Sequence, residues 1–405
     1  MSDIAAPPSA PLAGSASAHN ALVYVRDSDS EGVIRQALSD LGVSDVTFKT
    51  GGVSAALADL SERSSPRLLI VDVSDLRDPT GPATELIGQC EPSTGVVLIG
   101  QSNDIRLYRA LREIGAAEYF FKPLVSALVS RTCNAILKDE RASALDSGQH
   151  AARAGKLILV VGARGGVGAT TVAVRTAWRL SEHPPRPVVL VDLDLQFGDA
   201  ALQLDASPGH ALREALERAE RVDDLFLERG IIHVSKRLDL LAALEPLDDK
   251  ITFEEDALLS LLDTLRRRYR YVVVDLQPAC AVTLPRVLHL PSVLILVSDA
   301  GLASAREVGR LRQMIGPNSP ERATMHILNK SGAAGALPLQ EFARGAGQTP
   351  DVIIPWSREI ADAGNMGVKA KPDCAVLDRA LGPVFARVAG EKVEPGRSLL
   401  SRLFG

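Results

Sequence analysis

The sequence has few cysteines, few aromatic residues and no long apolar run. Its four cysteines show no Cys-x-x-Cys spacing, so nothing in their pattern indicates disulfides, a zinc site or an iron–sulfur cluster. No stretch approaches the length of about eighteen apolar residues that suggests a membrane helix, and the first residues lack the basic start and apolar core of a signal peptide. We therefore expect a cytoplasmic protein with at most peripheral membrane contact.

Aromatic residues make up only 4% of the chain, although hydrophobic residues make up 46%. This balance is typical of the Ala, Leu and Val packing of parallel α/β sheets. The net charge of −5 lacks the positive potential of a general nucleic-acid binder. The one dense basic run, Arg266 to Arg270, ends an expected helix, where cations complement the helix C-terminus, so we expect no specific nucleic-acid partner.

Composition divides the 405 residues into five segments. Residues 1–19 are rich in Ala, Pro and Ser and are expected to form a disordered tail. Between residues 20 and 140, five short apolar strands alternate with helices, which predicts a doubly wound, flavodoxin-like domain. A linker at 141–154, a second α/β domain at 155–390 and a C-terminal tail at 391–405 follow.

The second domain opens with a glycine-rich turn between an apolar strand at 157–161 and a helix at 172–180. At such a turn the backbone N–H groups converge on phosphate oxygens, and the helix N-terminus adds partial positive charge. Thr170 would then ligate Mg²⁺. The usual lysine of the motif is missing, because Ala169 takes its position. The predicted phosphate site comprises Gly165, Gly166, Val167, Gly168, Ala169, Thr170 and Thr171.

Acidic residues end two further apolar strands of this domain. Asp192 and Asp194 follow the strand beginning at Val188, and Asp275 ends the strand beginning at Tyr271. A lone aspartate at a strand end commonly caps the next helix. Three such acids behind one phosphate-type loop instead favour a nucleotide site with Mg²⁺, because carboxylates hold this ion directly or through water.

The run from Arg164 to Thr171 resembles the deviant Walker A loop of the ParA/MinD family of dimeric ATPases. The resemblance implies a homodimer that binds ATP or ADP with Mg²⁺, and a P-loop fold of the doubly wound type. It places Arg164 where a cation reaches the partner's nucleotide. It assigns the positioning of the hydrolytic water to Asp194, and it places Asp192 near the metal.

The same resemblance extends to the end of the domain. Asn329 occupies the place of the residue that contacts adenine, and Pro355 and Trp356 occupy the place of the segment that flanks the base. Trp356 could stack on a base, but core or interface packing is an equally ordinary use of tryptophan.

Ala169 leaves hydrolysis open. In related enzymes a single cation at the transferred phosphate changes the rate by about 10³ to 10⁵. Arg164 could compensate within a dimer, since a guanidinium forks onto two phosphate oxygens. We expect nucleotide binding with weak or absent hydrolysis.

The first domain resembles a response-regulator receiver. Asp72 ends the third expected strand at the place of the phospho-acceptor, and Lys122 with Pro123 follows the fifth. Of the acidic pair that holds Mg²⁺ in receivers only Asp27 remains, beside Arg26, and Gly100 replaces the switch hydroxyl residue. These departures predict a pseudo-receiver used for docking or dimerisation. Alternatively, Asp72 is only a polar residue at a strand end.

A degenerate receiver joined to such a P-loop domain resembles the CpaE/TadZ family of Flp/Tad pilus assembly proteins, with further matches at 194–200, 212–216, 223–227 and 240–243. The resemblance implies a nucleotide-dependent dimeric scaffold at the cell pole or near the inner membrane. Its partners would be pilus assembly or secretion machinery and polar landmark proteins. A partitioning ATPase and a phosphorylation-controlled signalling protein are the alternatives. Leu399, Leu400, Leu403 and Phe404 share one face of a short C-terminal helix, for which we expect docking onto a partner or the dimer. Membrane binding and a frayed tail are the alternatives.

Overall fold

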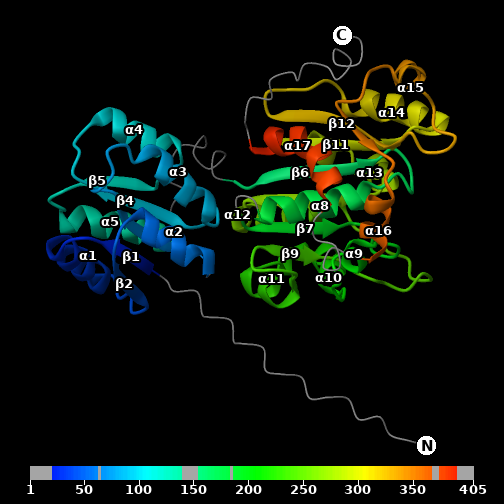
Figure 1. Cartoon of the computed structure of the whole chain (residues 1–405). Coiled ribbons are helices and arrows are strands. Elements are labelled where there is room, and N and C mark those ends of the chain that lie inside the picture. The colour runs from blue at the N-terminus through cyan, green and yellow to red at the C-terminus, as the bar shows by residue number, and fades with distance from the viewer. Residues whose placement is uncertain (1–20, 63–64, 139–153, 183–185, 367–373, 390–405) are drawn as a thin grey trace, which may run out of the picture. The chain divides into compact units, whose positions relative to one another are not determined.

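The structure is a computed structural model described over residues 21–62, 65–138, 154–182, 186–366 and 374–389 (Figure 1). The expected tails at 1–19 and 391–405, including Leu399 to Phe404, lie outside these residues, as does nearly all of the expected linker. The chain divides into two compact units, one with residues 1–87 and 94–146 and the other with residues 88–93 and 147–405. In the described part of the chain, no helix has the length and apolar character needed to cross a membrane.

The first unit contains a parallel five-stranded sheet in the order β2-β1-β3-β4-β5, the strand order of flavodoxin-like folds. Its helix α1 begins at Ser28, because the Asp27 carboxylate accepts the Ser30 N–H at 2.7 Å and caps the first turn. The strands are β1 Ala21–Val25, β2 Val46–Thr50, β3 Leu68–Asp72, β4 Gly95–Gly100 and β5 Glu118–Phe121. The helices are α1 Ser28–Asp40, α2 Val53–Glu62, α3 Thr80–Gln89, α4 Ile105–Glu113 and α5 Ser126–Leu137.

The second unit contains an eight-stranded sheet in the order β13-β12-β11-β6-β10-β7-β9-β8. All neighbouring strands pair in parallel except β8 and β9, which form an antiparallel edge that the sequence did not indicate. The strands are β6 Lys156–Gly162, β7 Val188–Asp192, β8 Ile232–His233, β9 Leu238–Leu241, β10 Tyr271–Leu276, β11 Ser292–Asp299, β12 Arg322–Ser331 and β13 Val352–Pro355. The predicted fold class, two doubly wound α/β units, is confirmed.

Helices cover both faces of this sheet (Figure 1). Residues of α10, α12 and α14 pack on one face, and residues of α8 and α17 pack on the other. The helices are α8 Ala169–Glu182, α9 Ala200–Gln203, α10 Ala211–Glu217, α11 Asp224–Gly230, α12 Glu255–Arg268, α13 Pro278–Thr283, α14 Leu302–Ile315, α15 Leu339–Ala346, α16 Arg358–Met366 and α17 Ala375–Ala389, with short 3₁₀ turns at Ala219–Arg221 and Val287–His289.

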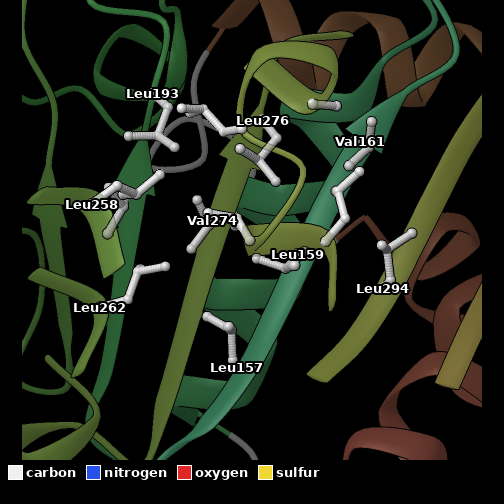
Figure 2. Close-up of a cluster of buried hydrophobic side chains, with 14 of the residues drawn as sticks. Leu157, Leu159, Val161, Leu193, Leu258, Leu262, Val274, Leu276 and Leu294 are labelled. Atoms are coloured by element: carbon white, nitrogen blue, oxygen red, sulfur yellow. The ribbon is translucent and has the colours of Figure 1, made fainter. Parts of the chain in front are cut away.

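Strand β6 is apolar from Leu157 to Val161, and both of its faces are buried there. Leu157, Leu159 and Val161 face one side, in the same buried cluster as Val274 and Leu258 (Figure 2), while the alternate residues belong to the opposite cluster. Truncating a buried leucine such as Leu159 to alanine costs about 2 to 5 kcal/mol of unfolding free energy. The packing of this strand therefore stabilises the position of the loop that follows it. It lies between β10 and β11, at the point where the strand order reverses and ligands of doubly wound sheets bind.

Candidate functional site

A pocket of about 820 Å³ lies at the carboxyl ends of the central strands of the second unit. A volume of this size suits a small-molecule or cofactor ligand. The structure brings together here every residue of the second domain that the sequence singled out for a nucleotide or metal. They are Arg164, Gly165, Gly166, Val167, Gly168, Ala169, Thr170, Thr171, Asp192, Asp194, Asp275, Asn329, Pro355 and Trp356.

The glycine-rich loop joins β6 to the first turn of α8. Gly166 and Gly168 have φ values of +78° and +91°, a region that side chains disfavour. A Cβ atom on Gly168 would also lie 2.5 Å from the Asn329 amide nitrogen. Ala169 is the first residue of α8, so the helix N-terminus faces the pocket without a side-chain cation. The backbone is therefore the main binding element that this loop offers an anion.

Two buried carboxylates lie next to each other beside the loop. Asp192 and Asp275 are register partners on β7 and β10, with exposed fractions of 2% and 6%. Burial raises the pKa of both side chains. Repulsion from Asp192 adds to the rise for Asp275, and repulsion from Asp194 and Asp199 adds to the rise for Asp192. The Thr170 hydroxyl bonds to Asp275 and opposes this rise. A cation between the carboxylates would relieve the repulsion.

This donor set fits Mg²⁺. One hydroxyl and two carboxylates are hard oxygen ligands, and Mg²⁺ in nucleotide sites is commonly held by one or two carboxylates together with phosphates and water. Within the described residues, no three His, Cys, Asp or Glu side chains form a group that could hold a metal by themselves. Thr170, Asp192 and Asp275 would accordingly share the ion with a bound nucleotide.

Asp194 lies in the loop that follows β7. Its half-buried carboxylate accepts the Phe197 N–H at 2.9 Å and so stabilises a tight turn. The turn requires Gly198, because a Cβ atom there would lie 2.4 Å from the Asp194 carbonyl oxygen and 2.5 Å from an Asp192 carboxylate oxygen. Asp194 is thus held at the edge of the pocket, next to the buried pair.

Among the described residues, the pocket lining contains two cations, Arg164 and Lys330. The Arg164 guanidinium is half exposed and lies 3.5 Å from the Asp299 carboxylate. Sequence reasoning missed Lys330, whose ammonium donates to the Gly166 carbonyl oxygen at 2.7 Å. Its position directly after Asn329 at a strand end was the only available signal.

Asn329 and Trp356 take different positions relative to the loop. The buried Asn329 amide donates to the Val167 carbonyl oxygen at 2.8 Å and therefore holds the loop backbone. Trp356 is 57% exposed, so its indole is not part of the core, and it lies beside Pro355 on the pocket wall. An indole in this position is accessible to a planar ligand.

The receiver-like site of the first unit also comes together. The Lys122 ammonium lies 2.5 Å from an Asp27 carboxylate oxygen and 2.6 Å from an Asp72 carboxylate oxygen, and Asp72 is fully buried. Burial opposes the ionisation of Asp27, but hydrogen bonds from Lys122 and Ser30 lower its pKa to about 2. The Lys122–Pro123 peptide bond is cis.

Two residues near this acidic site have partners of their own. Arg26 forms an ion pair with Asp75 at 2.8 Å, so it is Lys122 rather than Arg26 that lies between the two acids. A Cβ atom on Gly100 would lie 2.7 Å from the Tyr119 hydroxyl, which donates to the Ser102 carbonyl oxygen. Tyr119 therefore occupies the space that a switch hydroxyl residue would need.

Many solved structures resemble parts of this chain, among them the following three. A ParA family ATPase from Chlorobium tepidum is 24% identical, with 56% of this chain and 98% of that chain covered and a TM-score of 0.48. The septum site-determining protein MinD of Pyrococcus horikoshii, solved with Mg-ADP, is 22% identical over 58% and 98%, with a TM-score of 0.47. A pilus assembly protein CpaE from Caulobacter crescentus is 29% identical over 29% and 91%, with a TM-score of 0.27.

No curated protein matches the chain. Residues 155–319 match a protein-family model described as an AAA domain. This match covers the glycine-rich loop and the strands β7 and β10, which carry Asp192 and Asp275. Together with the parallel sheet and the arrangement of loop and acids, it identifies an ATPase-type P-loop fold in the second unit.

Proposed function

We propose that this protein is a nucleotide-dependent dimeric localisation and scaffold factor for the assembly of Flp/Tad type pili. It binds ATP or ADP with Mg²⁺ and hydrolyses ATP weakly or not at all. The observation that carries the nucleotide part is the phosphate-type loop at the N-terminus of α8, which faces the buried pair Asp192 and Asp275 while Ala169 replaces the expected lysine.

Binding and turnover depend on different parts of this site. Backbone N–H groups, the helix N-terminus and a cation on Thr170, Asp192 and Asp275 recognise phosphates without any lysine. The departure of the γ-phosphoryl group requires additional positive charge, which Ala169 does not supply. Asp194 lines the same pocket and would position the water molecule, so the lost cation would be the main barrier to hydrolysis.

A second copy of the chain would complete the site. Arg164 is half exposed and weakly paired, which leaves it able to reach a nucleotide bound by a partner. Phe197 lines the pocket with an exposed fraction of 71%, and Leu202 on α9 is 77% exposed, so apolar surface is present for a partner to cover. The pilus role and the polar location rest on the sequence resemblance to the CpaE/TadZ family.

The test uses the full chain. Titration with labelled ATP should show Mg²⁺-dependent binding, phosphate release should be far slower than one per second, and light scattering should show a dimer with ATP. Arg164→Ala should weaken the ATP-dependent dimer, whereas Arg344→Ala, an exposed arginine on α15, should leave it intact. Absence of binding at millimolar nucleotide, or fast turnover, would contradict the nucleotide part.

The pilus role needs a test in cells. Deletion of the protein should abolish Flp/Tad pili, and a fluorescent fusion should localise to a pole. A DNA-binding partitioning ATPase is the competing outcome. The basic run at the end of α12 gives it little support, because Arg266 donates to the Gly155 carbonyl oxygen at 2.8 Å and Arg267 pairs with Asp263. Tight DNA binding that persists at physiological salt, with normal pili in the deletion strain, would favour partitioning.

A further inference from the structure

The end of β12 turns its last residues toward the glycine-rich loop. The pairing of β12 with β13 shifts register between Leu328 and Ser331, which is a bulge-like irregularity. Within it, Lys330 has a φ of +55°, an uncommon conformation for a residue other than glycine. Because the backbone is irregular here, the side chains of Asn329 and Lys330 do not follow the alternating directions of a regular strand.

Both side chains donate to consecutive carbonyl groups of the loop. The Lys330 ammonium bonds to the Gly166 carbonyl oxygen at 2.7 Å, and the Asn329 amide bonds to the Val167 carbonyl oxygen at 2.8 Å. In a planar trans peptide the carbonyl and the following N–H point in opposite directions. The N–H groups of Val167 and Gly168 are therefore directed away from β12.

The loop needs such support more than an ordinary phosphate loop does. Gly165, Gly166 and Gly168 give it wide conformational freedom in the unbound state, and ordering glycines is entropically expensive. With Ala169 in place of the lysine, affinity for phosphates depends on how well the loop amides are held in position.

We propose that Asn329 and Lys330 form a brace that fixes the phosphate loop of the same subunit. The brace rests on the proposed nucleotide function and adds to it a positioning role for Lys330. It acts on the loop amides and not on the base or on the γ-phosphate. The ligands that depend on it are thus nucleoside di- and triphosphates alike.

The experiment compares Lys330→Met, Lys330→Arg and the wild-type full chain. Lys330 is exposed, and methionine keeps the length of the stem at the same φ, so loss of the ammonium is the main change. Removing a charged hydrogen bond predicts an affinity loss of about tenfold to hundredfold for ATP and for ADP. Binding of adenosine should not change, and arginine should restore most of the loss. Lys250→Met, an exposed lysine outside the pocket lining, is the control.

A second measurement does not need nucleotide. Amide hydrogen exchange at 163–170 in the ligand-free protein should become faster in Lys330→Met and return toward wild type in Lys330→Arg. Unchanged exchange overturns the brace. A loss for ATP but not ADP also overturns it, because that pattern indicates a direct γ-phosphate contact. If the wild type binds no nucleotide, the nucleotide function fails, and the exchange result alone decides whether the brace exists.

Discussion

In the first unit, Lys122 lies between Asp27 and Asp72, whereas in the second unit Asp192 and Asp275 lie next to each other beside a loop in which Ala169 replaces the lysine. Both pairs stand at the carboxyl ends of parallel strands. The first pair has its cation built in. The second pair faces an open pocket and needs a cation from solution.

The pKa shifts follow this difference in charge balance. The pKa of Asp27 is lowered because Lys122 and Ser30 bond to its ionised form in spite of burial. The pKa values of Asp192 and Asp275 are raised because burial and repulsion from neighbouring carboxylates disfavour ionisation. Acids at strand ends are therefore available to a metal ion only where the fold supplies no internal cation.

The largest expected effect comes from adding a cation to the second site. Ala169→Lys should raise ATP hydrolysis by about 10³-fold or more, because the lysine would neutralise the departing phosphoryl group. Phosphate release measures it. Ala169→Met is the uncharged control, and adding Asp194→Ala should remove the gain. Equal rates for the lysine and methionine variants would show that charge at this position does not limit catalysis.

Removing the cation from the first site should destabilise that unit. Lys122→Met leaves the fully buried Asp72 without its ammonium partner, which costs about 3 to 5 kcal/mol of unfolding free energy for buried pairs. Both tryptophans, Trp178 and Trp356, lie in the second unit, so their fluorescence reports that unit while circular dichroism reports both. In the variant, the first unit should unfold before the second, and this first transition should appear in circular dichroism but not in tryptophan fluorescence. A simultaneous shift of both signals would contradict a local effect.

The two sites should respond to pH in opposite directions. Raised pKa values mean that Asp192 and Asp275 favour the folded state when protonated, so this stability is present at low pH and is lost as pH rises through the raised values. Ligand-free protein should therefore show a falling tryptophan-monitored Tm from acidic to neutral pH and above. Asp275→Asn or added Mg²⁺ should flatten the slope.

For Asp27 the pH dependence of stability has the opposite sign. Its pKa is lowered, so its contribution is present above the ordinary carboxylate pKa and is lost as pH falls toward about 2. Circular dichroism at acidic pH should show a loss in the first unit that Asp27→Asn makes less steep. If both units lose stability in the same direction, the contrast between the two sites is wrong.

The smallest effect is expected from Asp72→Asn. Phosphoryl transfer needs a metal at paired carboxylates. Here the Lys122 ammonium pairs with both acids, and Tyr119 takes the space beside Gly100. Acetyl phosphate with Mg²⁺ should leave no adduct at Asp72 in mass spectra, and the variant should localise normally. Deletion of residues 20–140 should abolish localisation, because the contribution of this domain is its surface. A stoichiometric adduct with loss of function in Asp72→Asn would restore the signalling interpretation.

The sequence predicted much of the framework from local patterns. The apolar run at 157–161 and the glycines after it are adjacent in the sequence and determine local structure. The strand, the loop and the following helix could therefore be placed from the sequence. The start of α1 depends on one side-chain contact, because the Ser30 N–H donates to the Asp27 carboxylate and this capping bond outweighs the weak helix preference of the polar residues before Gly32. The antiparallel edge of β8 and β9 was missed because β8 is only two residues long.

By itself the sequence determined which residues could carry chemistry: the glycine loop, the acids at strand ends and the absence of a lysine at 169. Only the tertiary structure decided how charges are balanced. Lys122 is separated from Asp27 by 95 residues and Lys330 from Gly166 by 164, yet each pair is in hydrogen-bonding contact. No local pattern records such distances, because parallel sheets bring the ends of distant strands together and burial then sets the cost of every unpaired charge.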